Sequence, residues 1–201
     1  MRLLGLSFPN GNCQANSRVY IKSFKIMKPK VRTFMNKSIE NLKAAFAGES
    51  QANRRYLAFA QKAEEEGHPQ VAKLFKAAAE AETVHAMNHT RTMGEIRTTA
   101  ENLNTAVGGE TFEFRQMYPE YINIAKQEKN TQAIWSFNVA NQVEKIHANL
   151  FTKAINALKT GREPQKAEYY VCNVCGNTVE NEPPEKCPIC GSPKSKFFKV
   201  A

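Results

Sequence analysis

Apolar residues recur at every third or fourth position from residue 38 to residue 160, which is the spacing of one face of an α-helix. Gly67 and Pro69 interrupt the first stretch, because glycine ends helices and proline suits the first turn of the next one. Pro119 is expected to kink the third helix after Tyr118. The pattern predicts four helices, at about 38–66, 69–96, 103–128 and 130–161, and four helices of this length form a bundle.

The character of the chain changes twice along its 201 residues. Residues 1–37 are basic and irregular, residues 38–160 carry the helical pattern, and residues 161–201 are rich in Gly, Pro and Cys. We therefore predict a disordered N-terminal extension, a helical bundle, and a linker followed by a small module that is held together by a metal. The fold class is mainly α.

The helical part contains an internal repeat. Gly48-Glu49-Ser50 matches Gly109-Glu110-Thr111, and Glu82-x-x-His85 matches Glu144-x-x-His147. The two glutamates of each half are 33 residues apart in the first half and 34 in the second. Each half is thus a helix with one glutamate followed by a helix with Glu-x-x-His, and the two halves pack about a pseudo-two-fold axis in one bundle.

This repeat predicts a two-metal site. Residues three apart on a helix share a face, so each Glu-x-x-His directs a carboxylate and an imidazole to one point. With Glu49 and Glu110, four carboxylates and two imidazoles meet at the bundle axis, and buried carboxylates need a compensating charge. Two iron ions would supply that charge, as in di-iron and di-manganese carboxylate bundles. One Glu-x-x-His on a solvated face would mean little, but two copies in register are much more specific.

Four further residues lie near these positions. Glu113, one turn after Glu110, is either an extra ligand or a surface acid. His89 is expected to be a neighbour of the site or a surface residue rather than a ligand. Tyr56 and Tyr118 are either core aromatics or hydrogen-bond donors to the metal carboxylates.

Four cysteines form a second candidate metal site. Cys172 and Cys175 make one CxxC knuckle, and Cys187 and Cys190 make another after a spacer at 176–186. Four thiolates suit either zinc or a single iron, and the spacing does not choose between them. A structural zinc ribbon is the alternative to a redox-active iron site. Paired knuckles disfavour a thioredoxin-like dithiol.

Charge and hydropathy exclude several classes of protein. Of the 28 Lys and Arg residues, seven lie in residues 1–35, which contain no acidic residue. Residues 36–201 contain the other 21 together with all 19 acidic residues, so this part of the chain is nearly neutral. A nucleic-acid interface is therefore not expected. No apolar run is long enough for a membrane helix, and none resembles a secretory signal. We expect a cytoplasmic protein.

The basic extension permits three interpretations. It is an over-extended start, with Met27 or Met35 as the true initiator, or a transit peptide, or a surface-binding tail. A transit peptide would move the protein to a mitochondrion-related organelle without changing its chemistry.

From about Met35 to Ala201 the sequence resembles the rubrerythrin family. The resemblance rests on the two Glu-x-x-His pairs and on several further motifs: Ala47-Gly48-Glu49-Ser50-Gln51, Gly109-Glu110 with Glu113, Met117-Tyr118-Pro119, Tyr170-Val-Cys172, and Cys187-Pro-Ile-Cys190-Gly-Ser-Pro193-Lys194. It implies a ferritin-like di-iron four-helix bundle joined to a rubredoxin-like mononuclear iron site, and hence three iron ions per chain.

The resemblance also implies roles for single residues. Glu82 and Glu144 would be the bridging carboxylates. Glu49 would be terminal on one iron, and Glu110 with His147 on the other. His85 and Glu113 would bind the first iron alternately in its reduced and oxidised states. Tyr56 and Tyr118 would lie near the irons, and Cys172, Cys175, Cys187 and Cys190 would hold the electron-relay iron.

The function implied is the reduction of hydrogen peroxide to water, which protects organisms that avoid oxygen. Electrons would come from a rubredoxin or an NAD(P)H-dependent reductase. Because the linker at 161–168 is short, we expect a head-to-tail homodimer or a larger homo-oligomer, in which one chain's relay serves the other's bundle. The alternatives are a ferritin-type ferroxidase and a non-enzymatic peroxide or metal sensor.

Overall fold

The structure, a computed structural model, describes residues 37–201, and the predictions made for the extension lie outside these residues. The described helices come in the predicted order, and the boundaries that differ most from the prediction are the end of α2 and the start of α3. They are α1 (Lys37–Glu65), α2 (Pro69–Thr92), α3 (Thr99–Phe112), the π-helical turn η1 (Glu113–Met117), α4 (Tyr118–Gln127) and α5 (Thr131–Lys159).

The helix ends follow from local chemistry. Pro69 occupies the first turn of α2, as predicted. Helix α2 ends at Thr92 instead of near Ile96, because Gly94 takes the left-handed conformation with φ 69° just beyond it. Helix α3 begins at Thr99, earlier than predicted, because Thr98 forms a capping box with Glu101.

The predicted kink in the third helix is a π-helical turn. The amide of Tyr118 donates to the carbonyl of Glu113, five residues earlier, at the point where η1 passes into α4. Pro119 follows immediately and has no N–H to continue the α-helical ladder. The widened turn therefore begins at Glu113, and π-turns of this kind are frequent at functional sites.

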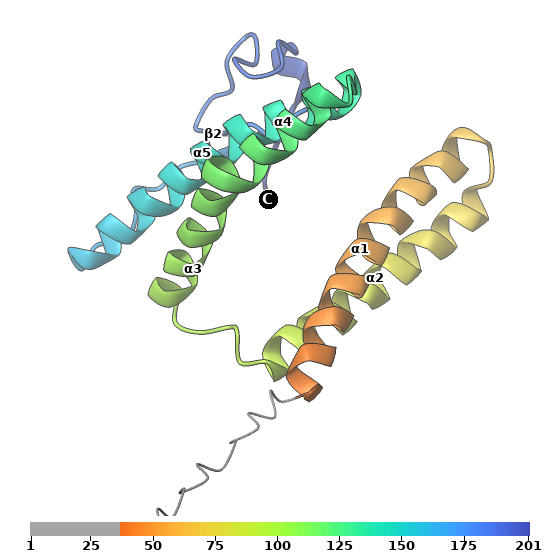
Figure 1. Ribbon diagram of the computed structural model, residues 1–201, viewed down its shortest axis with the longest axis horizontal. Helices are drawn as coiled ribbons and strands as arrows, with labels where there is room; N and C mark the ends of the chain where they lie inside the picture. The colour runs from red at the N-terminus through yellow and green to blue at the C-terminus, as the bar shows by residue number, and fades with distance from the viewer. Residues whose placement is uncertain (1–36) are drawn as a thin grey trace, which may run out of the picture.

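The helices pack in two groups. Helices α1 and α2 lie against each other and form the first helix pair, and α3 and α4 lie against α5 and form the second helix group. Figure 1 shows that these two bodies stand apart and are joined by the connection at residues 93–98. The mainly helical fold class is confirmed. Within one chain, however, the four long helices do not close into the single bundle that the repeat predicted.

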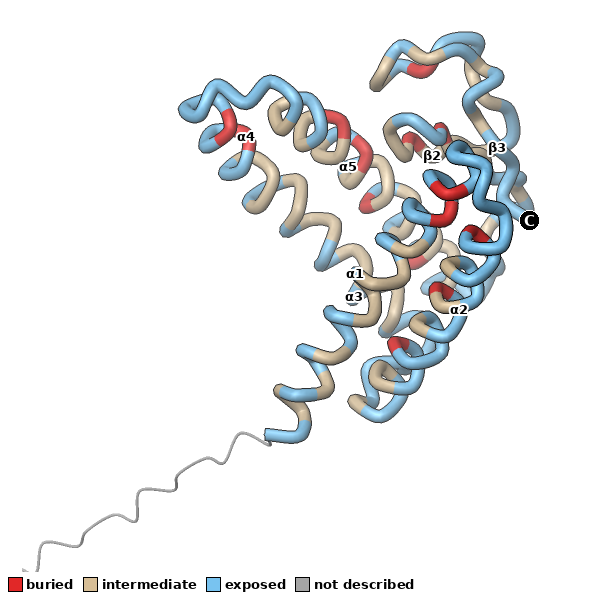
Figure 2. The backbone as a smooth tube through the Cα atoms, turned by 90° about the vertical axis from the view of Figure 1, so that its right-hand side faces the viewer, coloured by how far each residue is buried: buried red, intermediate tan, exposed pale blue. Residues whose placement is uncertain are grey.

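The buried positions of the helices are few and small. In the first helix pair, every buried side chain among the described residues is an alanine: Ala60, Ala63, Ala72, Ala79 and Ala86. Figure 2 shows that buried segments of the backbone are short and separated by exposed or intermediate ones. Larger apolar side chains such as Phe46, Val84 and Met87 remain exposed.

The C-terminal module is a small antiparallel sheet. Strand β1 (Tyr169–Cys172) lies between β2 (Thr178–Glu180) and β3 (Phe197–Lys199), and the 3-10 turn η2 (Lys194–Lys196) precedes β3. The linker after α5 brings this module back onto α5 of the same chain. Lys153 of α5 pairs with Glu180 of β2 at 2.6 Å, and Gly176 lies close to Val143.

No helix in the described part of the chain is long and apolar enough to cross a membrane.

Candidate metal centres

The first half-site lies on the first helix pair. Glu49 of α1 and Glu82 and His85 of α2 each offer a ligand atom, and these three atoms lie within 4.8 Å of one another. His85 Nδ1 is 2.8 Å from Glu82 Oε2. Asn53 holds the two helices in register, since its Nδ2 donates to the carbonyl of Ala79 at 2.7 Å. The side chain of His85 is 54% exposed, so this half-site is open to solvent.

The second half-site repeats this arrangement. Glu110 of α3 and Glu144 and His147 of α5 also bring ligand atoms within 4.8 Å of one another. His147 Nδ1 is 2.8 Å from Glu144 Oε2 and 4.0 Å from Glu110 Oε1. The structure thus gathers six of the seven predicted bundle ligands into two groups of three, one on each helix body.

The charge of the second half-site calls for a cation. Burial, a hydrogen bond with Glu144 and the charges of Glu144 and Glu113 raise the pKa of Glu110 to about 7. Burial and the charge of Glu144 also raise the pKa of Glu113, and His147 partly offsets this effect. Glu113, the seventh predicted ligand, therefore faces the same cluster without belonging to its tight group of three.

The two predicted tyrosines have different surroundings. Burial raises the pKa of Tyr118, and the charges of Glu144, Glu113 and Glu110 raise it further, so its ring lies beside the second half-site. Tyr56 packs in an aromatic cluster with Phe59 and Phe75, at ring-centroid distances of 6.4 and 6.1 Å.

The remaining histidines of the helices lie outside the two groups of three. His89 is half-buried in the last turn of α2. His68 is exposed at the start of that helix.

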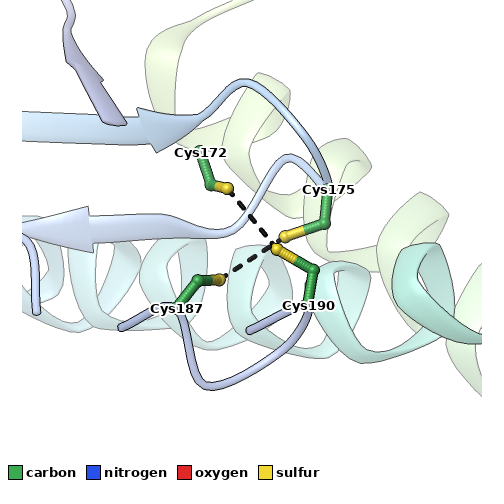
Figure 3. Close-up of side chains that lie close together, drawn as sticks. All are labelled: Cys172, Cys175, Cys187 and Cys190. Carbon is green, nitrogen blue, oxygen red and sulfur yellow. Dashed lines mark hydrogen bonds between the residues drawn. The ribbon is translucent and has the colours of Figure 1, made fainter. Parts of the chain in front are cut away.

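The four cysteines converge at one point between the two knuckles (Figure 3). Cys172 Sγ lies 3.7 Å from Cys190 Sγ, and Cys175 Sγ lies 3.6 Å from Cys187 Sγ. These distances are too long for disulfides. They match the edge of a tetrahedron with metal–sulfur bonds of about 2.3 Å, which is about 3.8 Å. The donor set therefore fits one tetrahedral zinc or iron ion.

The backbone of each knuckle turns at a glycine. Gly176 and Gly191 follow the second cysteine of each knuckle, with φ of 81° and 78°, values that side chains rarely adopt. Their amides donate to the carbonyls of Cys172 and Cys187, at 2.8 and 2.9 Å. Each turn therefore places two sulfurs on the same side of the backbone.

The thiols differ in how easily they lose their protons. Burial raises the pKa of the Cys175 thiol well above its usual range. Burial also acts on Cys190, but hydrogen bonds with Ser192 outweigh it and lower the pKa of Cys190 to about 6. A metal ion at this site would displace the protons that burial retains, since thiolates are the binding form.

Thr178 connects the cysteine module to the second half-site. Its Oγ1 donates to the carbonyl of Gly176 at 3.1 Å and lies 2.9 Å from His147 Nε2. Because its own proton is engaged, the hydroxyl must accept from His147, which places an N–H on Nε2. Nδ1 of His147 is then the nitrogen that faces Glu144 and Glu110 and can bind a metal.

Sequence reasoning missed this contact. Thr178 lies in the spacer between the knuckles, where its type and position carry no metal-binding signal. The sequence also led us to expect that the relay would serve another chain's bundle. In the structure, the cysteine module lies on α5 of its own chain.

Helix pairs that carry paired Glu-x-x-His motifs, together with a four-cysteine module, define a di-metal carboxylate protein with a rubredoxin-like domain. Residues 40–155 match the rubrerythrin family model, and residues 170–198 match the model of the rubrerythrin rubredoxin-like domain. The chain belongs to the rubrerythrin family.

Relatives cover most of both chains. The chain is 37% identical over 170 residues to rubrerythrin-2 of Clostridium acetobutylicum, covering 78% of this chain and 92% of the relative. It is 35% identical over 180 residues to nigerythrin of Nitratidesulfovibrio vulgaris, covering 83% and 88%. A solved structure of nigerythrin in a mixed-valence state aligns over 94% of this chain and all of that chain, with 32% identity and a TM-score of 0.49.

Family membership and the two kinds of metal site imply an iron oxidoreductase that acts in oxidative stress.

Proposed function

We propose that this protein is a peroxidase that reduces hydrogen peroxide to water at a di-iron site, using electrons relayed from the cysteine module. The observation that carries the proposal is the direct hydrogen bond between Thr178 of that module and His147 of the second half-site. A zinc ribbon with a purely structural role would not need to touch a metal-binding histidine.

The two groups of three ligand residues and the four cysteines would hold the metals. The first half-site offers Glu49, Glu82 and His85, and the second offers Glu110, Glu144 and His147, with Glu113 beside it. Glu82 and Glu144 would bridge two irons, and His85 and Glu113 would alternate on one of them. The four cysteines would hold a third iron.

Iron at these sites would supply the electrons, so that hydrogen peroxide takes up two electrons and two protons and yields two molecules of water. The chain's own residues would supply and hold protons. Glu113 binds a proton more readily than an ordinary glutamate. The raised pKa of Tyr118 keeps its hydroxyl protonated, so it can donate a hydrogen bond beside the carboxylates.

The protein would work with an external electron donor, either a rubredoxin or an NAD(P)H-dependent reductase. We place it in the cytoplasm, because reducing compartments keep clustered CxxC thiols available for metals. The proposed active form is a homo-oligomer.

The test is anaerobic turnover with the full-length chain. We expect about three irons per chain and repeated peroxide consumption when a reductase and NAD(P)H are supplied. The Cys175→Ala variant should keep its bundle iron and lose the turnover fed by the donor, whereas Cys13→Ala, outside the module, should leave it unchanged.

Two results would refute the proposal. Zinc at the cysteines with no turnover would favour a sensor. Iron oxidation by oxygen, with progressive iron accumulation and no donor dependence, would favour a ferroxidase.

A further inference from the structure

We propose that the di-metal site forms between two copies of this chain. The first helix pair of one copy closes on the second helix group of the other, so that a dimer contains two four-helix bundles. Neither bundle is made by a single chain. This inference rests on the proposed function only in taking the two half-sites as parts of one metal centre.

Each half-site is incomplete by itself. It offers three ligand atoms, whereas two metal ions need the four carboxylates and two imidazoles of both halves. In one chain the two halves lie on helix bodies that stand apart (Figure 1). His85, 54% exposed, has no cover of the kind that a bundle interior provides.

The connection between the halves is too short for one chain to close a ferritin-like bundle. In such bundles a long crossover joins the second and third helices, which therefore run in the same direction. Glu82 lies ten residues before the end of α2, and Glu110 lies eleven residues after the start of α3. At 1.5 Å per residue, a connection that brings the two glutamates level must span about 31 Å.

Residues 93–98 cannot reach that far. From Thr92 to Thr99, a fully extended chain covers at most about 25 Å. Within each half, the two glutamates are 33 or 34 residues apart, and a short turn joins the two antiparallel helices. Between the halves, where a long crossover is needed, Glu110 follows Glu82 by only 28 residues. Exchange between two copies removes the conflict, because each connection then passes from one bundle to the other.

Hydrogen bonds hold the connection in its open form. The amide of Arg97 donates to Oδ1 of Asn102, and Nδ2 of Asn102 donates back to the carbonyl of Arg97, both at 2.9 Å. The capping box of Thr98 and Glu101 fixes the start of α3, and Gly94 fixes the end of α2. Little of the connection is left free to bend back on its own chain.

The faces to be covered suit a second copy. In the first helix pair, a groove of about 190 Å³ combines Glu82 and Asn53 with the apolar Phe46 and Met87. Between the second helix group and the cysteine module, a groove of about 590 Å³ combines the ligands Glu110 and His147 with apolar side chains of α3 and α5. Tyr169, Thr178 and Val200 of the module complete its lining. Both grooves place metal ligands beside apolar side chains, so each half-site has apolar surface next to it that a second copy could cover.

The exchange also settles which relay serves which site. The cysteine module contacts His147 and Lys153 of its own α5. Each composite site would therefore receive its electrons and its second half-site from one chain, and its first half-site from the other.

Complementation between two inactive variants tests the proposal. One chain carries Glu49→Gln with Glu82→Gln, and the other carries Glu110→Gln with Glu144→Gln. The two chains bear different affinity tags, are co-expressed, and are purified as the mixed dimer. Ferrous iron is then added anaerobically and counted. A matched control pairs Glu65→Gln with Glu120→Gln, two exposed acids outside the half-sites.

Helix exchange predicts that each variant alone loses its bundle iron and that the mixed dimer recovers half of the wild-type bundle content. One of its two bundles then has every native ligand. Without exchange, every bundle contains two glutamines, and the mixed dimer stays as empty as the variants. That result, or a wild-type monomer with a full complement of iron, would overturn the inference.

A longer connection provides a second measurement. Inserting about twelve Gly and Ser residues between Gly94 and Glu95 lets one chain reach across its own bundle. We expect light scattering to show a shift from dimer to monomer with bundle iron retained. The same insertion at Gly67, in the turn between α1 and α2, should leave the dimer intact.

These tests separate the two proposals. If the wild-type bundle holds no iron, the proposed function fails, yet the mass change on lengthening the connection still reports helix exchange. If the iron is present but the long insertion leaves the dimer unchanged, the exchange fails alone.

Discussion

Replacing Thr178 by valine should weaken the di-metal site from a position that binds no metal. Valine has nearly the shape of threonine but cannot accept the proton of His147 Nε2, which now lies 2.9 Å from the hydroxyl oxygen. The imidazole then loses the bond that fixes its tautomer and its ring orientation. The atom that would bind the metal is Nδ1, which lies 2.8 Å from Glu144 Oε2, and it would no longer be held in position.

The magnitude follows from the kind of bond that is lost. A neutral hydrogen bond in a half-buried site contributes about 1 kcal/mol, which is about a five-fold change in affinity. Bonds that orient metal-binding histidines weaken metal affinity by about 10- to 100-fold when removed. Because the His147 side chain is only 27% exposed, water replaces the hydroxyl poorly, and we expect a loss of about ten-fold.

The assay is anaerobic competition for ferrous iron against a chelator, with bundle iron and cysteine-bound iron distinguished by their spectra. Thr178→Ser keeps the hydroxyl and should restore the affinity. Thr160→Val, at an exposed helix end, is the control for losing a threonine. Equal iron affinity in Thr178→Val and the wild type would refute the orienting role of Thr178. The same conclusion would follow if Thr178→Ser lost as much iron affinity as Thr178→Val.

Protonation of Glu110, metal at the cysteines and packing of Ala79 each affect stability in a measurable way. In the metal-free protein, the pKa of Glu110 is raised from 4.5 to about 7. Its protonated form therefore stabilises the fold fully below about pH 4.5, and this stability is lost as the pH rises through 7. The melting temperature should fall across this pH range, and Glu110→Gln should make it less dependent on pH. Removing the cysteine-bound metal with a chelator should abolish the fixed structure of residues 169–199, seen as lost amide dispersion in NMR spectra, while helical circular dichroism persists. Ala79→Leu, at a position with no exposed surface between α1 and α2, should cost about 1–3 kcal/mol by overpacking, measured by urea unfolding against Val84→Leu on the exposed face.

Much of the candidate site could be predicted because its ligands follow helical periodicity. Glu82 with His85, and Glu144 with His147, depend only on a three-residue spacing within one helix. The cysteine site depends on local turns, which Gly176 and Gly191 allow. The helix ends depended on caps such as Thr98, whose signal is weaker than that of a proline.

Long-range placement could not be read in the same way. The contact of Thr178 with His147 joins residues 31 positions apart, and it exists only because the linker turns the module back onto α5. The separation of the helix bodies depends on where α2 ends and α3 begins, at Thr92 and Thr99, and the apolar pattern placed both boundaries about four residues too far along the chain. Without those ends, the distance between Glu82 and Glu110 could not be compared with the reach of the connection.

Helix exchange links metal binding to association. A metal ion held by ligands from two copies stabilises the dimer and not the separated chains, so dimer affinity must rise with free iron concentration. Burial and the neighbouring carboxylates of Glu144 and Glu113, which together raise the pKa of Glu110, disfavour the charged second half-site and so oppose closure until a cation binds. Metal-free protein should therefore dissociate at a higher concentration than the iron-loaded form, and sedimentation of the two forms over a dilution series measures the difference. An identical dissociation constant with and without iron would mean that the ligands of each centre come from a single chain.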